Sequence, residues 1–231
     1  MSSGIIASCS NDKTIKLFNI KGNNYNIIQT LNYHTNSIYK IIELKNKYLV
    51  SCSTDKSIIF YLKENYEYKK NYQILANGEC YCIKEIKENE ICYSEGFGDC
   101  NICFYNLNEN KIKSSISNIS KSDISPFIIS KELLFISGEN KISIININSY
   151  ELIKEIEVPN SGFIRSACIL NENIIFTGDD GSIIREWKIE GDNLILISKK
   201  ENAHNDWIIT LLNIGNEYIA SGSFDKLIKI W

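Results

Sequence analysis

The chain consists of one unit repeated along its length, and this period limits the folds open to it. Four segments align with little adjustment, residues 7–18, 50–61, 93–105 and 220–231, and two weaker copies lie between them at 135–146 and 176–187. Each copy contains an acidic residue that serves as an anchor, and successive anchors are 40 to 45 residues apart: Asp12, Asp55, Asp99, Glu139, Asp180 and Asp225. Both histidines, His34 and His204, stand 21 residues before an anchor.

Each copy alternates apolar and polar residues with the period of a β-strand. In the first copy Ile15 and Leu17 alternate with Thr14 and Lys16, and β-branched and aromatic side chains suit a pleated, half-buried surface. Short polar turns join paired runs, and further apolar runs precede and follow each pair. We therefore expect an all-β chain with four short antiparallel strands in each unit. Such a sheet cannot bury both faces alone, so the units must stack.

At the level of these motifs the sequence resembles the WD-repeat (tryptophan-aspartate) β-propeller family over essentially all of its length. The resemblance implies about six four-stranded antiparallel blades. In that family a histidine before the innermost strand, a serine on the second strand, the aspartate of the tight turn and the tryptophan ending the third strand form a hydrogen-bonded network. The resemblance carries these roles to His204, Ser221, Asp225 and Trp231, and less completely to His34, Ser51, Asp55 and Tyr61.

Several units depart from the family pattern. The histidine position carries Gly78 in the third unit, Asn118 in the fourth, and Pro159 or Asn160 in the fifth. The fifth unit also has one extra residue between its anchor and Trp187, which suggests a bulge or a one-residue shift. We expect the networks of these central blades to be absent or rebuilt, and the blades to depend more on isoleucine packing than on buried polar groups.

The repeats predict a single propeller domain over residues 1–231. Its units are approximately 1–32, 33–76, 77–117, 118–159, 160–201 and 202–231. The first unit starts at its second strand and the last stops at the end of its third, so we expect three-stranded sheets at both ends of the series. Three explanations compete: a plain six-bladed closure, a fragment of a seven-bladed propeller, or strands donated by a partner at the seam, as in open propellers of coat and pore scaffolds.

Composition excludes several classes of function. The net charge is −3 with both signs interspersed, which disfavours nucleic acid as a partner because nucleic acid demands a basic face. No apolar run approaches the length needed to span a membrane, and the N-terminus lacks the pattern of a secretory signal. The eight cysteines are scattered through strands, so we expect free thiols and an intracellular location, in the cytoplasm or the nucleus.

Two clusters invite a chemical interpretation, and we weigh each against a structural one. Five cysteines fall in the third unit, but they lack the spacing and the histidine typical of zinc sites: Cys80, Cys82, Cys92, Cys100 and Cys103. The two His, Ser and Asp sets match the parts of a serine hydrolase, yet they recur at fixed repeat positions without a glycine-flanked nucleophile. Adjacent Asp179 and Asp180 are interpreted as turn residues. We expect no catalytic residues, no metal and no cofactor.

Aromatic and charged residues remain at positions that reach the rim of a propeller of this family. They are Tyr39, Tyr81, Phe127, Phe163, Arg165 and Trp207 from the innermost strands, with Phe97 and Phe224 from the hairpins. These residue types dominate binding hot spots, although individual members could instead pack between blades. The primary hypothesis is a non-catalytic scaffold for peptides or protein partners, with Trp207, Phe163, Arg165 and Phe224 as the best candidate patch. The alternatives are an assembly subunit that accepts strands at its seam and, less favoured, an enzyme.

Overall fold

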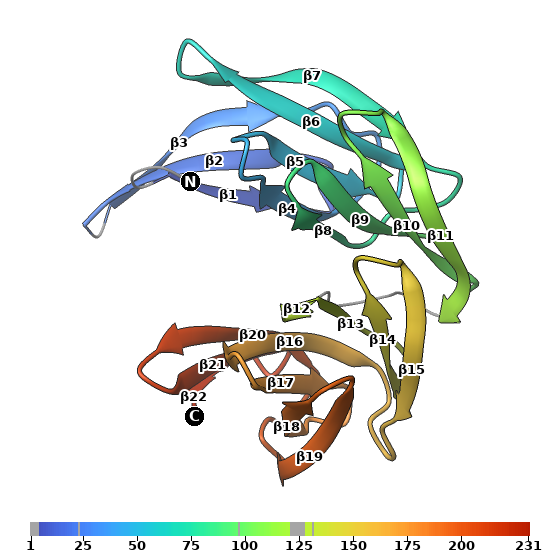
Figure 1. Ribbon diagram of the computed structural model, residues 1–231. Coiled ribbons are helices and arrows are strands. Elements are labelled where there is room, and N and C mark those ends of the chain that lie inside the picture. Colours follow the sequence, from blue (N-terminus) through green and yellow to red (C-terminus); the bar gives the residue numbers. More distant parts are fainter. Residues whose placement is uncertain (1–4, 23, 97, 121–127, 131) are drawn as a thin grey trace. The chain divides into compact units, whose positions relative to one another are not determined.

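The computed structural model describes residues 5–22, 24–96, 98–120, 128–130 and 132–231 (Figure 1). Within these ranges the regular structure is β-strand, arranged as six antiparallel meanders of three or four strands. The expected fold class is confirmed, including three-stranded sheets at the two ends of the series. The described residues contain no helix with the length and apolar character that a membrane-spanning helix requires.

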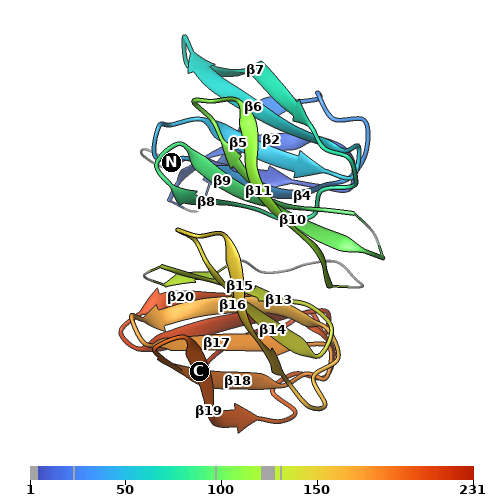
Figure 2. The same cartoon turned by 45° about the vertical axis from the view of Figure 1, so that its right-hand side comes forward.

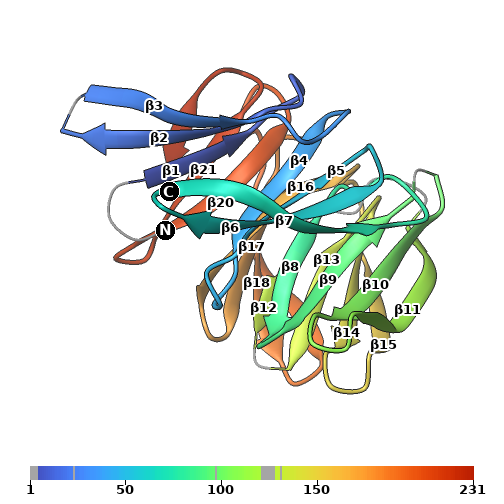
Figure 3. The same ribbon diagram turned by 90° about the horizontal axis from the view of Figure 1, so that it is seen from above.

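The chain divides into two compact units, Met1–Ser117 and Asn118–Trp231. The strands of the first unit form three sheets. The first sheet is β1 (Ile5–Cys9), β2 (Ile15–Lys21) and β3 (Asn24–Leu31), which lie side by side in Figure 3. The second is β4 (Ile38–Glu43), β5 (Leu49–Ser53), β6 (Ser57–Glu64) and β7 (Glu67–Leu75); the third is β8 (Ile83–Lys87), β9 (Glu90–Glu95), β10 (Cys100–Asn106) and β11 (Lys111–Ser120).

The second unit holds the remaining three sheets. The fourth sheet is β12 (Ile128–Ser130), β13 (Leu133–Ser137), β14 (Lys141–Asn146) and β15 (Glu151–Glu157), and the fifth is β16 (Ile164–Asn171), β17 (Ile174–Asp179), β18 (Ile184–Glu190) and β19 (Asn193–Lys200). The sixth is β20 (Ile208–Gly215), β21 (Tyr218–Ser223) and β22 (Ile228–Ile230). The innermost strands of the fifth and sixth sheets, β16 and β20, lie beside each other (Figures 1 and 2).

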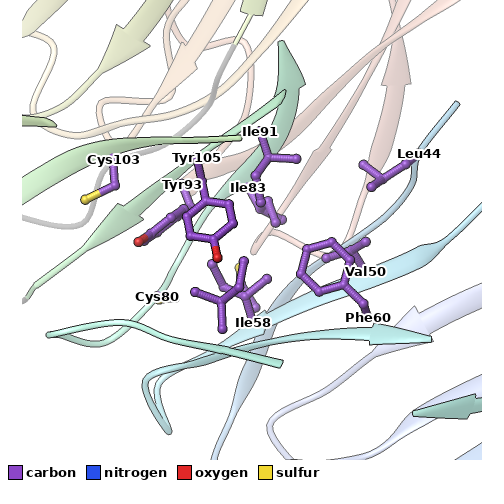
Figure 4. Close-up of a cluster of buried hydrophobic side chains, with 12 residues drawn as sticks. Leu44, Val50, Ile58, Phe60, Cys80, Ile83, Ile91, Tyr93, Cys103 and Tyr105 are labelled. Atoms are coloured by element: carbon purple, nitrogen blue, oxygen red, sulfur yellow. The ribbon is translucent and has the colours of Figure 1, made fainter. Parts of the chain in front are cut away.

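The core of each unit lies between neighbouring sheets. Figure 4 shows the cluster that joins the second and third sheets, where Ile58 and Phe60 of β6 meet Ile83 and Ile91 of β8 and β9. These four side chains are at most 1% exposed. Full burial of one such side chain stabilises the fold by roughly 1.5 to 3 kcal/mol relative to leaving it exposed. Packing of apolar faces between sheets therefore supplies most of the cohesion of each unit.

A β-bulge recurs at one place in four sheets. The register between the third and fourth strands shifts by one residue immediately before the position that ends the family motif, which is occupied here by Phe18, Tyr61, Ile145 and Trp187. A bulge increases local twist and redirects side chains. Its recurrence shows that these four sheets share the same backbone conformation at this position even where their side chains differ.

The tight turn between the second and third strands of a sequence repeat corrects the alignment of the fifth repeat. The last residue of this turn has a positive φ in five sheets: Lys13, Lys56, Asn140, Ser182 and Lys226. Gly181, which precedes Ser182, therefore stands where Asp55 and Asp225 stand, and Asp180 lies one position earlier. From Gly181 to Trp187 is the same step as from Asp225 to Trp231. The extra residue is therefore a one-residue shift of the alignment, one of the two alternatives expected, because Gly181 and not the acidic Asp180 occupies the turn position.

One expectation fails, at the end of the third sheet. The sequence predicts that Asn118 occupies the histidine position of the fourth sequence repeat. In the structure it lies within β11, the outermost strand of the third sheet. Its φ of 57° places it in the left-handed region, which asparagine tolerates better than most residues. The third sheet therefore extends further along the sequence than its apolar pattern indicated.

Candidate functional site

Four side chains of the sixth sheet and its loops are joined in series by hydrogen bonds, from Asp225 through His204 and Ser221 to Trp231. His204 Nδ1 lies 2.8 Å from Asp225 Oδ2, and His204 Nε2 lies 2.6 Å from Ser221 Oγ. Trp231 Nε1 donates to the same Ser221 Oγ at 2.8 Å. The Asp225 carboxylate only accepts, so His204 donates from Nδ1, and in the neutral ring the unprotonated Nε2 accepts from the Ser221 hydroxyl. These hydrogen bonds link the loop before β20 to β21 and to the following turn.

The second sheet repeats this arrangement with one substitution. His34 contacts Asp55 at 2.9 Å and Ser51 at 2.7 Å, while the Tyr61 hydroxyl takes the place of the indole at 3.1 Å from Ser51 Oγ. Burial lowers the pKa of His34, which favours the neutral ring that Ser51 needs as an acceptor. Ser57, whose hydroxyl lies 2.6 Å from Asp55 Oδ1, joins the network.

Both aspartates are held as carboxylates by their hydrogen bonds. Burial raises the pKa of Asp225, but the Asn205 backbone N–H, His204 and the Leu227 backbone N–H outweigh it and hold the value at about 2. The pKa of Asp55 is likewise lowered, since hydrogen bonds from Ser57, Thr35 and His34 exceed the effect of burial.

The two networks are buried within their sheets. Ser51 is fully buried and Ser221 is 1% exposed, so neither hydroxyl is presented to a substrate. Each histidine nitrogen already has a partner, and each carboxylate accepts backbone N–H groups as well. This geometry suits a structural brace, because buried polar groups require satisfied hydrogen bonds.

In the fifth sheet the network is rebuilt around a buried ion pair. Trp187 Nε1 donates to Thr177 Oγ1 at 2.9 Å, which reproduces the indole contact of the sixth sheet. No histidine is present here. The Arg185 guanidinium instead binds Asp179 and donates at 3.3 Å to the carbonyls of both Pro159 and Asn160, the residues at the histidine position. Of the two alternatives expected for the central blades, an absent or a rebuilt network, the fifth sheet shows the rebuilt one.

Asp179 is fully buried and Arg185 is 3% exposed. Burial raises the pKa of Asp179 above its usual value, opposed by the Ile183 N–H and the Arg185 guanidinium. The sequence concealed this pair because Asp179 had been assigned to a turn. The signal for it was an arginine two residues before Trp187, on the face of β18 that alternation assigns to Trp187 and Ile189 and that is buried.

The third sheet carries a smaller substitute. Glu95 is 4% exposed and accepts the backbone N–H of Asn77 at 3.0 Å, the type of contact that Asp55 makes with Thr35 in the second sheet. The Asn77 side-chain amide donates to the same carboxylate at 3.3 Å. The Glu95 carboxylate, at the end of β9, thus makes part of the contacts that the turn aspartate makes in the second and sixth sheets.

The four residues of the candidate patch lie together on the second unit. The Arg165 guanidinium carbon lies 4.8 Å from the ring centroid of Phe163 and 5.1 Å from that of Trp207. The Trp207 and Phe224 rings are 5.7 Å apart at an angle of 31°. Trp207 is 41% and Phe224 is 53% exposed. We call these four residues the aromatic–arginine patch.

Asp180 completes the patch, and sequence reasoning missed its role. Its two carboxylate oxygens accept hydrogen bonds from Arg165 Nε at 2.8 Å and from Arg165 Nη2 at 3.0 Å. Such a two-point contact fixes the plane of a guanidinium, and here it holds Arg165 against the two rings. The sequence predicts for Asp180 the roles of repeat anchor and turn residue, and neither role indicates a contact with Arg165.

The remaining rim candidates lie elsewhere. Tyr39 is 48% exposed and packs edge-on against Tyr81, with ring centroids 4.8 Å apart, in the first unit. Phe97 and Phe127 lie outside the described residues.

The eight cysteines are free thiols, and seven of them are buried. Burial raises the pKa of Cys103 to about 12 and that of Cys168 to about 11. Protonated, buried thiols are poor nucleophiles and poor metal ligands. Among the residues that the structure describes, no group of three His, Cys, Asp or Glu side chains is arranged to hold a metal ion.

Comparisons with known proteins agree with this architecture. Residues 197–231 match the family model described as "WD domain, G-beta repeat". The chain is 23% identical to "Protein transport protein SEC13" of Yarrowia lipolytica across 98% of its own length and 72% of that protein. It is 24% identical to "WD repeat-containing protein 55 homolog" of Dictyostelium discoideum, across 62% of the chain and 35% of that protein.

Two solved structures share the fold. A chain of "Crystal Structure of Mitotic Checkpoint Complex" superposes with a TM-score of 0.84 at 10% identity, and "Structure of U3-55K" with 0.82 at 14%. Each comparison covers 99% of this chain and 73% of the other. Six short antiparallel meanders in series, with this likeness, define a repeat protein of the β-propeller class. Within that class, the matched segment and the motif residues are similar to those of WD-repeat proteins.

Proposed function

We propose that the protein is a non-catalytic scaffold that binds peptides or protein partners through the aromatic–arginine patch. The observation that carries this proposal is the mutual contact of Phe163, Arg165, Trp207 and Phe224 at a surface where the two outermost rings are about half exposed. Tryptophan and arginine are enriched among the residues that dominate binding energy. None of the four residues belongs to the buried apolar clusters of this unit.

The patch is also pre-organised, which favours binding. Arg165 is fixed by two hydrogen bonds to Asp180 and by contact with two rings. Side chains already ordered before binding lose less conformational entropy when a partner arrives. Names among the similar proteins, protein transport for one and a checkpoint complex for another, fit a protein that works through partners.

The direct test is affinity capture with the Trp207→Ala/Phe224→Ala variant. Truncation of hot-spot residues weakens a complex by about 2 kcal/mol or more each, so we expect the partners recovered by the unaltered chain to be lost. Tyr66→Ala is the matched control, since Tyr66 is 91% exposed but lies outside the patch. Equal recovery of the same partners by all three proteins would contradict the proposal.

A second candidate is an assembly subunit that accepts a strand from a partner. It is favoured by β22, whose outer edge pairs with no strand among the described residues and whose Ile228 and Ile230 are 81% and 65% exposed. An unpaired strand edge is a template for strand addition. Light scattering at several concentrations tests it: a strictly monomeric, protease-resistant chain excludes obligatory strand donation.

We further propose that the six sheets form one propeller domain over residues 1–231, and that the protein resides inside the cell, in the cytoplasm or the nucleus. Free, buried thiols support the location because such thiols persist in reducing compartments. The proposal includes neither catalysis nor nucleic acid. Both histidines are engaged in buried networks, and the net charge of −3 opposes a phosphate backbone.

A further inference from the structure

A hollow with an acidic lining adjoins the aromatic–arginine patch. Its volume is about 520 Å³, and its lining includes Glu139, Lys141, Glu157 and Asn160. Both glutamates are exposed at the surface. Lys141 is paired with Glu155, whereas neither Glu139 nor Glu157 has an ion-pair partner among the described residues. The hollow therefore presents two uncompensated carboxylates.

The hollow and the patch are physically continuous. Glu139 forms an isolated antiparallel bridge with Phe163, and Phe163 is the first member of the patch. From there the contacts run through Arg165 to Trp207 and then to Phe224. All of these residues belong to the second unit. A single extended segment of a partner could therefore contact the hollow and the exposed rings together.

The charges around this surface favour a basic partner. Arg165 is neutralised by Asp180 through two hydrogen bonds, so it is a poor receptor for an incoming carboxylate. Asp206, exposed beside Trp207, adds a third carboxylate without an ion pair in the described part of the chain. Lys226 is the opposing exposed cation. An acidic segment would be repelled by the hollow, while a cationic one would be attracted.

We infer that the partner segment is a basic peptide, with a lysine or arginine side chain in the hollow of Glu139 and Glu157 and a neighbouring apolar side chain on the rings of Trp207 and Phe224. The inference rests on the proposed function and adds the chemistry of the partner. An aliphatic or aromatic side chain suits the half-exposed Trp207 and Phe224 rings, whose centroids lie 5.7 Å apart, because covering apolar surface is favourable.

Selection from a displayed library of random peptides tests this on the full chain. Peptides are selected on the unaltered protein and counter-selected on Trp207→Ala/Phe224→Ala, so that only ligands of the patch remain. We expect these to be enriched in lysine or arginine beside an apolar residue. Enrichment of acidic or uncharged sequences instead would overturn the basic character while leaving the patch as a binding site. Failure to recover any ligand that depends on Trp207 would overturn the proposed function together with the inference.

The second arm measures one selected peptide by fluorescence anisotropy. Glu139→Gln/Glu157→Gln removes two exposed charges, each able to form one weak ion pair with the peptide, so it should weaken binding roughly twofold to thirtyfold at low salt and reduce its salt dependence. The control variant Glu67→Gln/Glu88→Gln removes the same charge from exposed positions of the first unit and should bind normally. Equal affinity of both variants and the unaltered chain would contradict the inference. Circular dichroism and a thermal melt confirm that each variant is folded.

Discussion

Replacing Arg185 with leucine should destabilise the protein far more than a typical substitution. Arg185 is 3% exposed, and its partner Asp179 is fully buried. Removing the guanidinium leaves the Asp179 carboxylate without its countercharge and the Pro159 and Asn160 carbonyls without their donor. Breaking a buried pair on one side costs about 3 to 5 kcal/mol. For a chain of this size that lowers the midpoint of thermal unfolding by roughly 6 to 20 °C.

A second variant separates the uncompensated charge from the loss of packing. Arg185→Leu/Asp179→Ser removes both charges and installs the serine that Ser53 and Ser223 provide at the same turn position of other sheets. We expect the double variant to be more stable than the single one. Thermal unfolding followed by circular dichroism measures both. If Arg185→Leu melts like the unaltered chain, or if the double variant is the less stable, the buried pair does not have the role assigned to it.

The pH dependence of Arg185→Leu supplies an internal check. Burial already raises the pKa of Asp179 in the folded protein, and loss of the arginine removes an opposing influence. The folded state then binds a proton more readily than the unfolded chain, so stability rises as pH falls toward the unfolded pKa near 3.9. The difference in the midpoint of thermal unfolding between Arg185→Leu and the unaltered chain should therefore decrease as the pH is lowered.

Three further predictions concern other parts of the chain. The pKa of His34 is lowered by burial, so its contribution to stability is present above pH about 6.5 and is lost below it; thermal melts from neutral to mildly acidic pH should show a smaller decline in His34→Gln. A Cβ on Gly178 would lie 2.6 Å from Ile208 Cγ2, so Gly178→Ala should cost about 1 to 3 kcal/mol in denaturant unfolding. Iodoacetamide should label Cys9 first in the native protein, because it alone among the eight cysteines is not classed as buried, and mass spectrometry should find all eight modified only after denaturation.

The strand pattern and the number of sheets could be predicted because they follow from local alternation. Isoleucine and aromatic residues at every second position specify a strand and its buried face without knowledge of distant contacts. The contacts of His34 with Asp55 and of His204 with Asp225 could likewise be predicted from their equal spacing, since the turn geometry around those aspartates is regular. The clustering of Trp207 with Phe224 could be inferred because both occupy repeat positions that reach the same rim.

Other features depend on interactions that a repeat alignment does not encode. Gly181 replaces the turn aspartate, so an alignment on acidic residues chose Asp180 and shifted the unit by one. The Arg185 pair with Asp179 substitutes one network for another of different chemistry, which no motif describes. The contact of Asp180 with Arg165 joins a turn to a neighbouring strand of the same sheet, and it becomes visible only when the register of that sheet is known.

The central claim, that partners dock on the aromatic–arginine patch, is tested most directly by site-specific photo-crosslinking. A benzophenone amino acid is placed at position 224 in the patch, at position 228 on the edge of β22, and at position 66 as an exposed control. We predict partner adducts from position 224 and none from position 66. Adducts confined to position 228 would instead assign binding to the strand edge, and their absence at 224 would contradict the claim.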